Sequence, residues 1–97
     1  MTSERAQAYH RVMRALGDLG PAKLQPGEQE RIRNAVDDLI FSRDVRRDPA
    51  ASAGLEDVER LCRDLVDSGR WAETSAMRLA DDVARCGPAL LPEVRAA

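Results

Sequence analysis

The sequence predicts an all-α protein, a compact four-helix and mostly antiparallel bundle that forms a single domain over residues 1–97. Four stretches carry apolar residues at every third or fourth position, which is the spacing of one buried stripe on a helix. A glycine, with or without a proline, follows three of these stretches and marks their ends. Strand-type alternation of useful length is absent. Short turns between consecutive helices favour antiparallel neighbours.

The first helix is expected over residues 3–19. Thr2 or Ser3 can cap its start with a hydroxyl oxygen. Gly20 and Pro21 should end it, because glycine allows a left-handed cap and proline cannot continue a helix. The expected buried stripe consists of Tyr9, Val12, Met13, Leu16 and Leu19.

The second helix is expected over residues 26–45, with Pro26 in the first turn, where a missing N–H costs nothing. Residues 46–54 are the most loop-like stretch of the chain. Within it, Asp48 precedes Pro49, and a residue before proline is pushed out of helical geometry. The expected stripe of the second helix consists of Ile32, Ala35, Val36, Leu39 and Ile40.

The third and fourth helices are expected over residues 53–68 and 72–86 and should form a hairpin. Gly69 suits the position that ends the third helix. The short apolar tail 88–97 is interrupted by prolines and should not form a long helix. The expected buried residues of the hairpin are Leu55, Val58, Leu61, Cys62, Leu65 and Val66, followed by Ala72, Ala76, Leu79, Ala80 and Val83.

Composition points to an ordinary cytoplasmic protein. Charged residues make up 33% of the chain, and the net charge of -2 provides no general attraction to nucleic acid or to an anionic membrane. No apolar run approaches the ~18 residues needed to span a bilayer, and the first residues lack the apolar core of a signal peptide. Fourteen of the fifteen basic residues are arginine, which we attribute to a GC-rich, bacterial genome.

Few residues could support catalysis. The single histidine, His10, is expected near the solvent face of the first helix, without a carboxylate partner for acid–base chemistry. Adjacent acids such as Asp37 and Asp38 point about 100° apart on a helix and therefore do not converge on a metal. We therefore expect a non-catalytic protein without a metal or another cofactor.

Phe41 is the residue that breaks the helical pattern. Counted from Ile32, it falls on the opposite side from the buried stripe, and Val45 falls close to it. Such an apolar face meets either another part of the chain or a partner. A tail folded over Phe41 is the expectation that we favour, and a homodimer that pairs the Phe41–Val45 face with itself across a two-fold axis is the alternative.

Two further features could contribute to a partner surface. Arg43, Arg46 and Arg47 cluster at the expected end of the second helix, where cations stabilise the helix dipole. The cluster could also bind an anion or an acidic partner, although aspartates interrupt it. Trp71 is expected to plug the end of the bundle with its N–H near solvent or a carbonyl, whereas an exposed Trp71 would be a binding hot spot.

These observations favour a small helical protein-interaction or regulatory module whose partner is another protein that the sequence does not identify. The candidate partner surface comprises Phe41, Val45, Arg43, Arg46, Arg47 and Trp71. One alternative is a nucleic-acid-associated regulator that uses the arginine cluster. Another is a small-molecule-binding helical bundle, which a closed apolar cavity would support.

Overall fold

The computed structural model describes residues 3–88, apart from the side chains at position 3 and positions 20–22. This part of the chain contains helices and the segments that connect them, without a strand. It confirms the predicted all-α four-helix bundle. The elements are α1 (Ser3–Lys23), α2 (Pro26–Ile40), the short 3-10 helix η1 (Val45–Arg47), α3 (Pro49–Asp67) and α4 (Glu73–Arg85).

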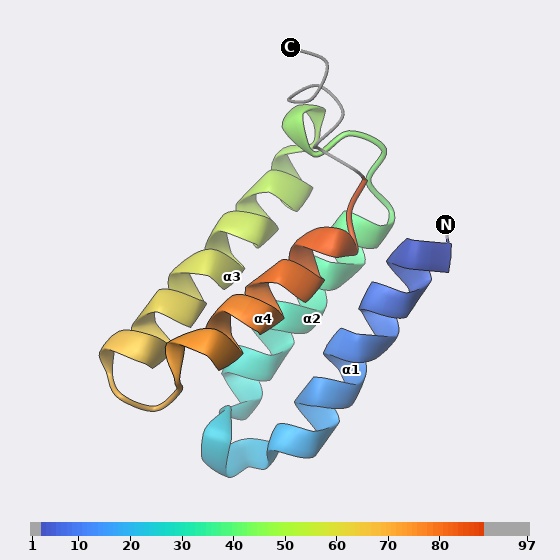
Figure 1. The fold of residues 1–97 in the computed structure, drawn as a ribbon. Coiled ribbons are helices and arrows are strands. Elements are labelled where there is room, and N and C mark those ends of the chain that lie inside the picture. The colour runs from blue at the N-terminus through green and yellow to red at the C-terminus, as the bar shows by residue number, and fades with distance from the viewer. Residues whose placement is uncertain (1–2, 89–97) are drawn as a thin grey trace.

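The connections between helices gather at two ends of an elongated molecule. Figure 1 shows the α1–α2 and α3–α4 turns at one end, which we call the turn end. The start of α1, the end of α4 and the α2–α3 connection lie at the other end, which we call the open end. The molecule measures 41 × 24 × 22 Å, with its long axis along the helices.

One hydrophobic core lies between the helices and contains residues of all four stripes. Helices α2 and α3 approach closely, because a Cβ atom built on Gly54 would lie only 3.1 Å from the Cα of Ala35. Ion pairs on the surface also join neighbouring helices. Arg31 of α2 lies 2.7 Å from Asp57 of α3. Arg11 of α1 lies 2.9 Å from Asp82 of α4.

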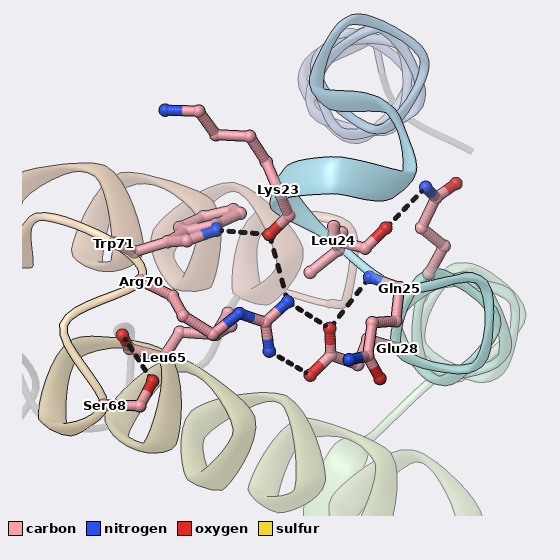
Figure 2. Close-up of polar contacts among 9 residues, drawn as sticks. Lys23, Leu24, Gln25, Glu28, Leu65, Ser68, Arg70 and Trp71 are labelled. Atoms are coloured by element: carbon pink, nitrogen blue, oxygen red, sulfur yellow. Dashed lines mark hydrogen bonds and ion pairs between the residues drawn. The ribbon is translucent and has the colours of Figure 1, made fainter.

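The prediction that Gly20 and Pro21 end the first helix is wrong, since α1 continues to Lys23. The carbonyl of Lys23 accepts hydrogen bonds from Trp71 Nε1 at 2.9 Å and from the Arg70 guanidinium at 3.3 Å (Figure 2). These donors come from the α3–α4 turn and cap the last turn of α1 from outside. Tertiary contacts therefore outweigh the local stop signal.

The second helix ends at Ile40 and not at residue 45. Arg5 of α1 reaches across the open end and donates hydrogen bonds to the carbonyls of Leu39 at 2.8 Å and Ile40 at 2.9 Å. It also donates to the carbonyl of Ser42 at 3.2 Å and to that of Cys86, at the end of α4, at 2.9 Å. One guanidinium therefore caps two helix ends, a role that the sequence analysis missed.

The third helix begins at Pro49, four residues before its predicted start. Asp48 has the extended backbone expected of a residue before proline, but it serves as the N-cap, and its carboxylate accepts the Ala51 N–H at 3.2 Å. The predicted stop at Gly69 is confirmed, with φ at +78°. The fourth helix, Glu73–Arg85, lies within one residue of its predicted bounds, and the predicted tail after residue 88 lies outside the described residues.

Candidate functional site

Two large hydrophobic side chains are exposed in the described part of the chain. Phe41 is 85% exposed and Met77 is 63% exposed. Each borders a different surface hollow, Phe41 at the open end and Met77 between α3 and α4. The candidate site is therefore a pair of surfaces.

The first surface surrounds a hollow of about 560 Å³ between the end of α2 and the start of α3. Its position follows from the early end of α2, because Phe41 is the C-cap residue and the chain leaves the helix there. We call it the Phe41 surface, and it consists of Phe41, Arg43, Asp44, Arg47, Asp48 and Pro49.

The positive groups of the Phe41 surface face solvent more than the negative ones. Asp44 accepts the backbone N–H of Arg46 at 3.1 Å and is only 35% exposed, while the carboxylate of Asp48 caps α3. In contrast, the side chain of Arg47 is 89% exposed, and Arg43 is exposed as well. The surface therefore offers an aromatic ring beside two exposed guanidinium groups and two less exposed carboxylates.

The structure brings together three of the six residues predicted for a partner surface, Phe41, Arg43 and Arg47. Arg46 is exposed but does not line this hollow. Val45 is not among the three, because it belongs to η1 and is only 6% exposed in the core. Trp71 is also excluded, since it is 9% exposed and donates its N–H to Lys23, as expected for a plug. The Leu90–Leu91 tail that was expected to cover Phe41 lies outside the described residues.

The second surface is a groove of about 490 Å³ between the C-terminal half of α3 and the N-terminal half of α4. We call it the α3–α4 groove. The sequence analysis did not predict this groove. The available signal was Met77, an apolar residue that lies beside the expected buried stripe and next to Ala76. Its apolar part is Cys62, Val66, Ala76, Met77 and Ala80, and its charged part is Glu59, Arg63, Asp67 and Glu73.

The α3–α4 groove is negatively charged. Its three carboxylates outnumber its one guanidinium and form no ion pair within residues 3–88. Asp67 is the last residue of α3, whose last turn contains no basic residue, so the negative end of the helix dipole adds to its charge. Burial raises the pKa of the Cys62 thiol, and Glu59 raises it further, which keeps this sulfur protonated at the floor of the groove.

The polar cluster at the turn end is structural. Figure 2 shows Arg70 facing Glu28, with both guanidinium–carboxylate contacts at 2.9 Å. Glu28 also accepts the N–H of Gln25 at 2.9 Å at the start of α2. The hydrogen bonds from Arg70 hold the pKa of Glu28 below its ordinary value. This cluster joins the two turns, because its guanidinium and carboxylate bind each other.

Other kinds of site find no support in the described residues. Within residues 3–88, no three His, Cys, Asp or Glu side chains are placed to hold a metal ion. None of the described helices is long and apolar enough to cross a membrane. None of the protein families, curated proteins or solved structures compared with the chain matches it.

Proposed function

We propose that the chain is a non-catalytic, mostly antiparallel helical bundle that acts as a cytoplasmic protein-interaction module and binds through the Phe41 surface. The observation that carries this proposal is the ring of Phe41, which is 85% exposed and shares a hollow with Arg43 and Arg47. Burying such a ring contributes roughly 1.5–3 kcal/mol. Aromatic residues and arginine are enriched at the centres of protein interfaces.

The chemistry of the Phe41 surface describes the partner that it fits. An exposed ring needs an apolar pocket, and the exposed guanidinium groups of Arg43 and Arg47 can bind further acceptors, of which carboxylates bind arginine most strongly. The partner should therefore present an apolar depression bordered by acidic residues. Charge complementarity of this kind speeds association and excludes partners with a basic surface.

The nucleic-acid alternative relies on the same arginines and has weaker support. Asp44 lies 3.6 Å from the Arg46 guanidinium and 3.7 Å from that of Arg47, which reduces the positive potential available to phosphates. Phosphate binding releases counterions, so affinity for DNA of arbitrary sequence would fall steeply with salt. A salt titration with such DNA therefore tests the alternative directly.

No specific observation favours small-molecule binding. Both hollows open to solvent, whereas sites for small molecules usually enclose most of the ligand surface. The apolar residues of the α3–α4 groove line an elongated interhelical face, which suits a protein segment better than an enclosed compound.

Site-specific photocrosslinking in the native host tests the proposed function. A photoreactive amino acid replaces Ala50, which is exposed on α3 next to Pro49 of the Phe41 surface. We expect covalent adducts that disappear when Phe41→Ser is added. The same photoreactive group at Arg14, exposed on α1, is the control and should not give these adducts.

The mass of an adduct identifies the kind of partner. Each added copy of this chain increases the mass by 10.7 kDa, whereas another protein adds its own mass. Circular dichroism must show that Phe41→Ser is folded, as expected for an exposed C-cap residue. Absence of adducts at position 50, or adducts that persist in Phe41→Ser, would contradict the proposal.

A further inference from the structure

We propose that the α3–α4 groove is a second interaction surface, which takes an amphipathic helix of a partner protein whose apolar face is bordered by lysine or arginine. This inference goes beyond the proposed function, because it concerns a different surface from that of Phe41. The groove combines an exposed apolar residue, Met77, with three carboxylates that form no ion pair within residues 3–88.

The apolar part of the groove follows both of its walls. On α3 it contains Cys62 and Val66, and on α4 it contains Ala76 and Ala80. In each pair the residues are one helical turn apart and therefore lie on the same face. The two alanines keep the α4 wall low, and Met77, which is 63% exposed, stands beside them. A row of apolar side chains from another helix can therefore enter between α3 and α4.

The secondary structure of the walls favours a helix as the occupant. The N–H and C=O groups of α3 and α4 bond within each helix, so the walls offer no row of free backbone groups to an extended segment. A helix satisfies its own backbone and places side chains at i, i+3, i+4 and i+7 into such a groove. The α3 wall from Glu59 to Asp67 is about 12 Å long at ~1.5 Å per residue, which corresponds to about two helical turns of the partner.

The charge of the groove selects a basic helix. Glu59, Asp67 and Glu73 lie along the groove with one guanidinium, that of Arg63. Arg63 is one turn from both Glu59 and Asp67, and its single charge can neutralise only one of them. The end of α3 adds negative charge beside Asp67, because the last turn of this helix contains no basic residue. The net charge of the groove therefore remains negative.

The other arginines near the groove do not compensate this charge. Arg60 lies 3.8 Å from Asp57, and Arg70 lies 2.9 Å from Glu28, so both are paired with carboxylates outside the groove. Arg78 does not line the groove. Cations from a partner can therefore bind the groove carboxylates. Like charges across an interface cost several kcal/mol, so an acidic helix with the same apolar face is excluded.

Fluorescence anisotropy with a defined probe tests this inference on the full chain. The probe is a labelled synthetic peptide of about 18 residues, because peptides shorter than ~12–15 residues are marginal helices in water. It carries leucine at helical spacing and lysine on both sides of the leucine row. We expect it to bind, and we expect added salt to weaken the binding. A matched peptide with glutamate in place of each lysine should bind about 10-fold more weakly or worse.

Two variants of the chain separate the apolar contribution from the charge. Met77→Ser should weaken binding of the lysine peptide about 10-fold, because a large apolar side chain is lost from the contact. Glu59→Gln combined with Asp67→Asn should weaken it about 2- to 10-fold. The matched control is Asp37→Asn combined with Asp38→Asn, which removes two exposed carboxylates from α2 and should bind like the wild type.

The methionines provide a readout that needs no substitution. With isotope-labelled methionine methyl groups, the lysine peptide should shift the NMR signal of Met77, which lines the groove. The signal of Met13, half-buried on α1, should stay in place. Phe41→Ser should bind the peptide like the wild type, because the Phe41 surface is separate from the groove.

Any of three results would overturn the inference. One is a lysine peptide that does not bind at millimolar concentration. Another is equal binding of the lysine and glutamate peptides, which shows that the groove does not select a basic helix. The third is binding that leaves Met77 unshifted or is lost in Phe41→Ser, which places the peptide on another surface. None of these results bears on the crosslinks at position 50, so the proposed function is tested separately.

Discussion

The turn end and the open end of the bundle are closed by different means. At the turn end, Arg70 and Trp71 follow directly after the α3 stop and bind Glu28 and Lys23 of the neighbouring turn. At the open end, a single residue from α1, Arg5, caps helix ends that are 34 and 81 positions away in sequence. The turn end is stabilised by several short segments, whereas at the open end one side chain caps the C-terminal ends of both α2 and α4.

This difference explains where the candidate partner surface lies. The turn end buries its aromatic residue, Trp71, and satisfies its N–H. The open end leaves Phe41 exposed, and the buried hydroxyl of Ser42 has no hydrogen-bond partner among the described residues. An end that is incompletely packed is the one at which a partner can bury additional apolar surface.

Leu65→Ala should have the largest effect of the changes considered, because it removes the packing beneath the turn end. Leu65 is 1% exposed, and its carbonyl accepts the N–H groups of Arg70 and Trp71. Loss of a fully buried leucine side chain costs roughly 2–5 kcal/mol of unfolding free energy. Chemical denaturation measures this loss. Leu55→Ala, at a half-buried position nearer the open end, should cost clearly less, and equal losses would contradict the difference between the ends.

Arg5→Ala tests the dependence of the open end on one side chain. Its guanidinium donates to four backbone carbonyls, and hydrogen bonds from a charged group contribute about 1.5–3 kcal/mol. We expect a loss of stability in this range by denaturant unfolding. Arg5→Lys should restore only part of it, because an ammonium group lacks the planar fork of donors. Arg14→Ala is the control. If Arg14→Ala lost as much stability as Arg5→Ala, the caps from Arg5 would not account for the effect.

Trp71→Phe sharpens the comparison at the turn end. The ring remains, but the N–H that donates to the Lys23 carbonyl at 2.9 Å is lost. A hydrogen bond of this kind contributes about 0.5–1.5 kcal/mol. Hydrogen exchange should accelerate in the last turn of α1 while the amides of α3 keep their protection. Unchanged exchange in α1 would show that this bond does not hold the helix past Pro21.

The smallest expected effect is the acid dependence of the turn end. Hydrogen bonds from Arg70 lower the pKa of Glu28 in the folded state, so the contribution is present above the ordinary pKa of 4.5. It is lost as the pH falls through the lowered folded pKa, because the unfolded state then binds the proton first. Glu28→Gln should therefore flatten the decrease in stability in acid. Unfolding curves measured from about pH 7 to pH 2 give the free energy of unfolding of both proteins. A parallel decrease of this free energy in the two proteins would refute the prediction.

Several features of the fold follow from local sequence chemistry. The spacing of apolar residues identifies the stripes that pack in the core, and Gly69 ends α3 because glycine adopts the positive φ that other residues avoid. The start of α3 was also available from the sequence. Asp48 followed by Pro49 is a helix start signal, an N-cap residue before a proline, although we interpreted it as part of a loop.

The candidate site was less accessible to sequence analysis. Helical spacing identified the anomaly at Phe41, and the arginines were identified because they cluster at the expected end of the second helix. Phe41, Arg43 and Arg47 lie on one surface. Val45 was assigned to the same face because a regular helix was assumed through residue 45. The end of α2 at Ile40 moves Val45 into the core. The α3–α4 groove was missed because its shape depends on how two helices pack. The position of Met77 beside the expected stripe indicated an exposed apolar residue but not a groove.

The sequence alone therefore determined which stretches are helical and which of their faces are buried, because helix periodicity and capping are properties of neighbouring residues. The tertiary structure decided where α1 and α2 end. Donors from distant segments, Arg5, Arg70 and Trp71, satisfy the terminal carbonyls. The free energy of those hydrogen bonds is available only after the bundle has brought the segments together. Phe41 is the first residue after the end of α2 at Ile40, and its side chain is exposed there.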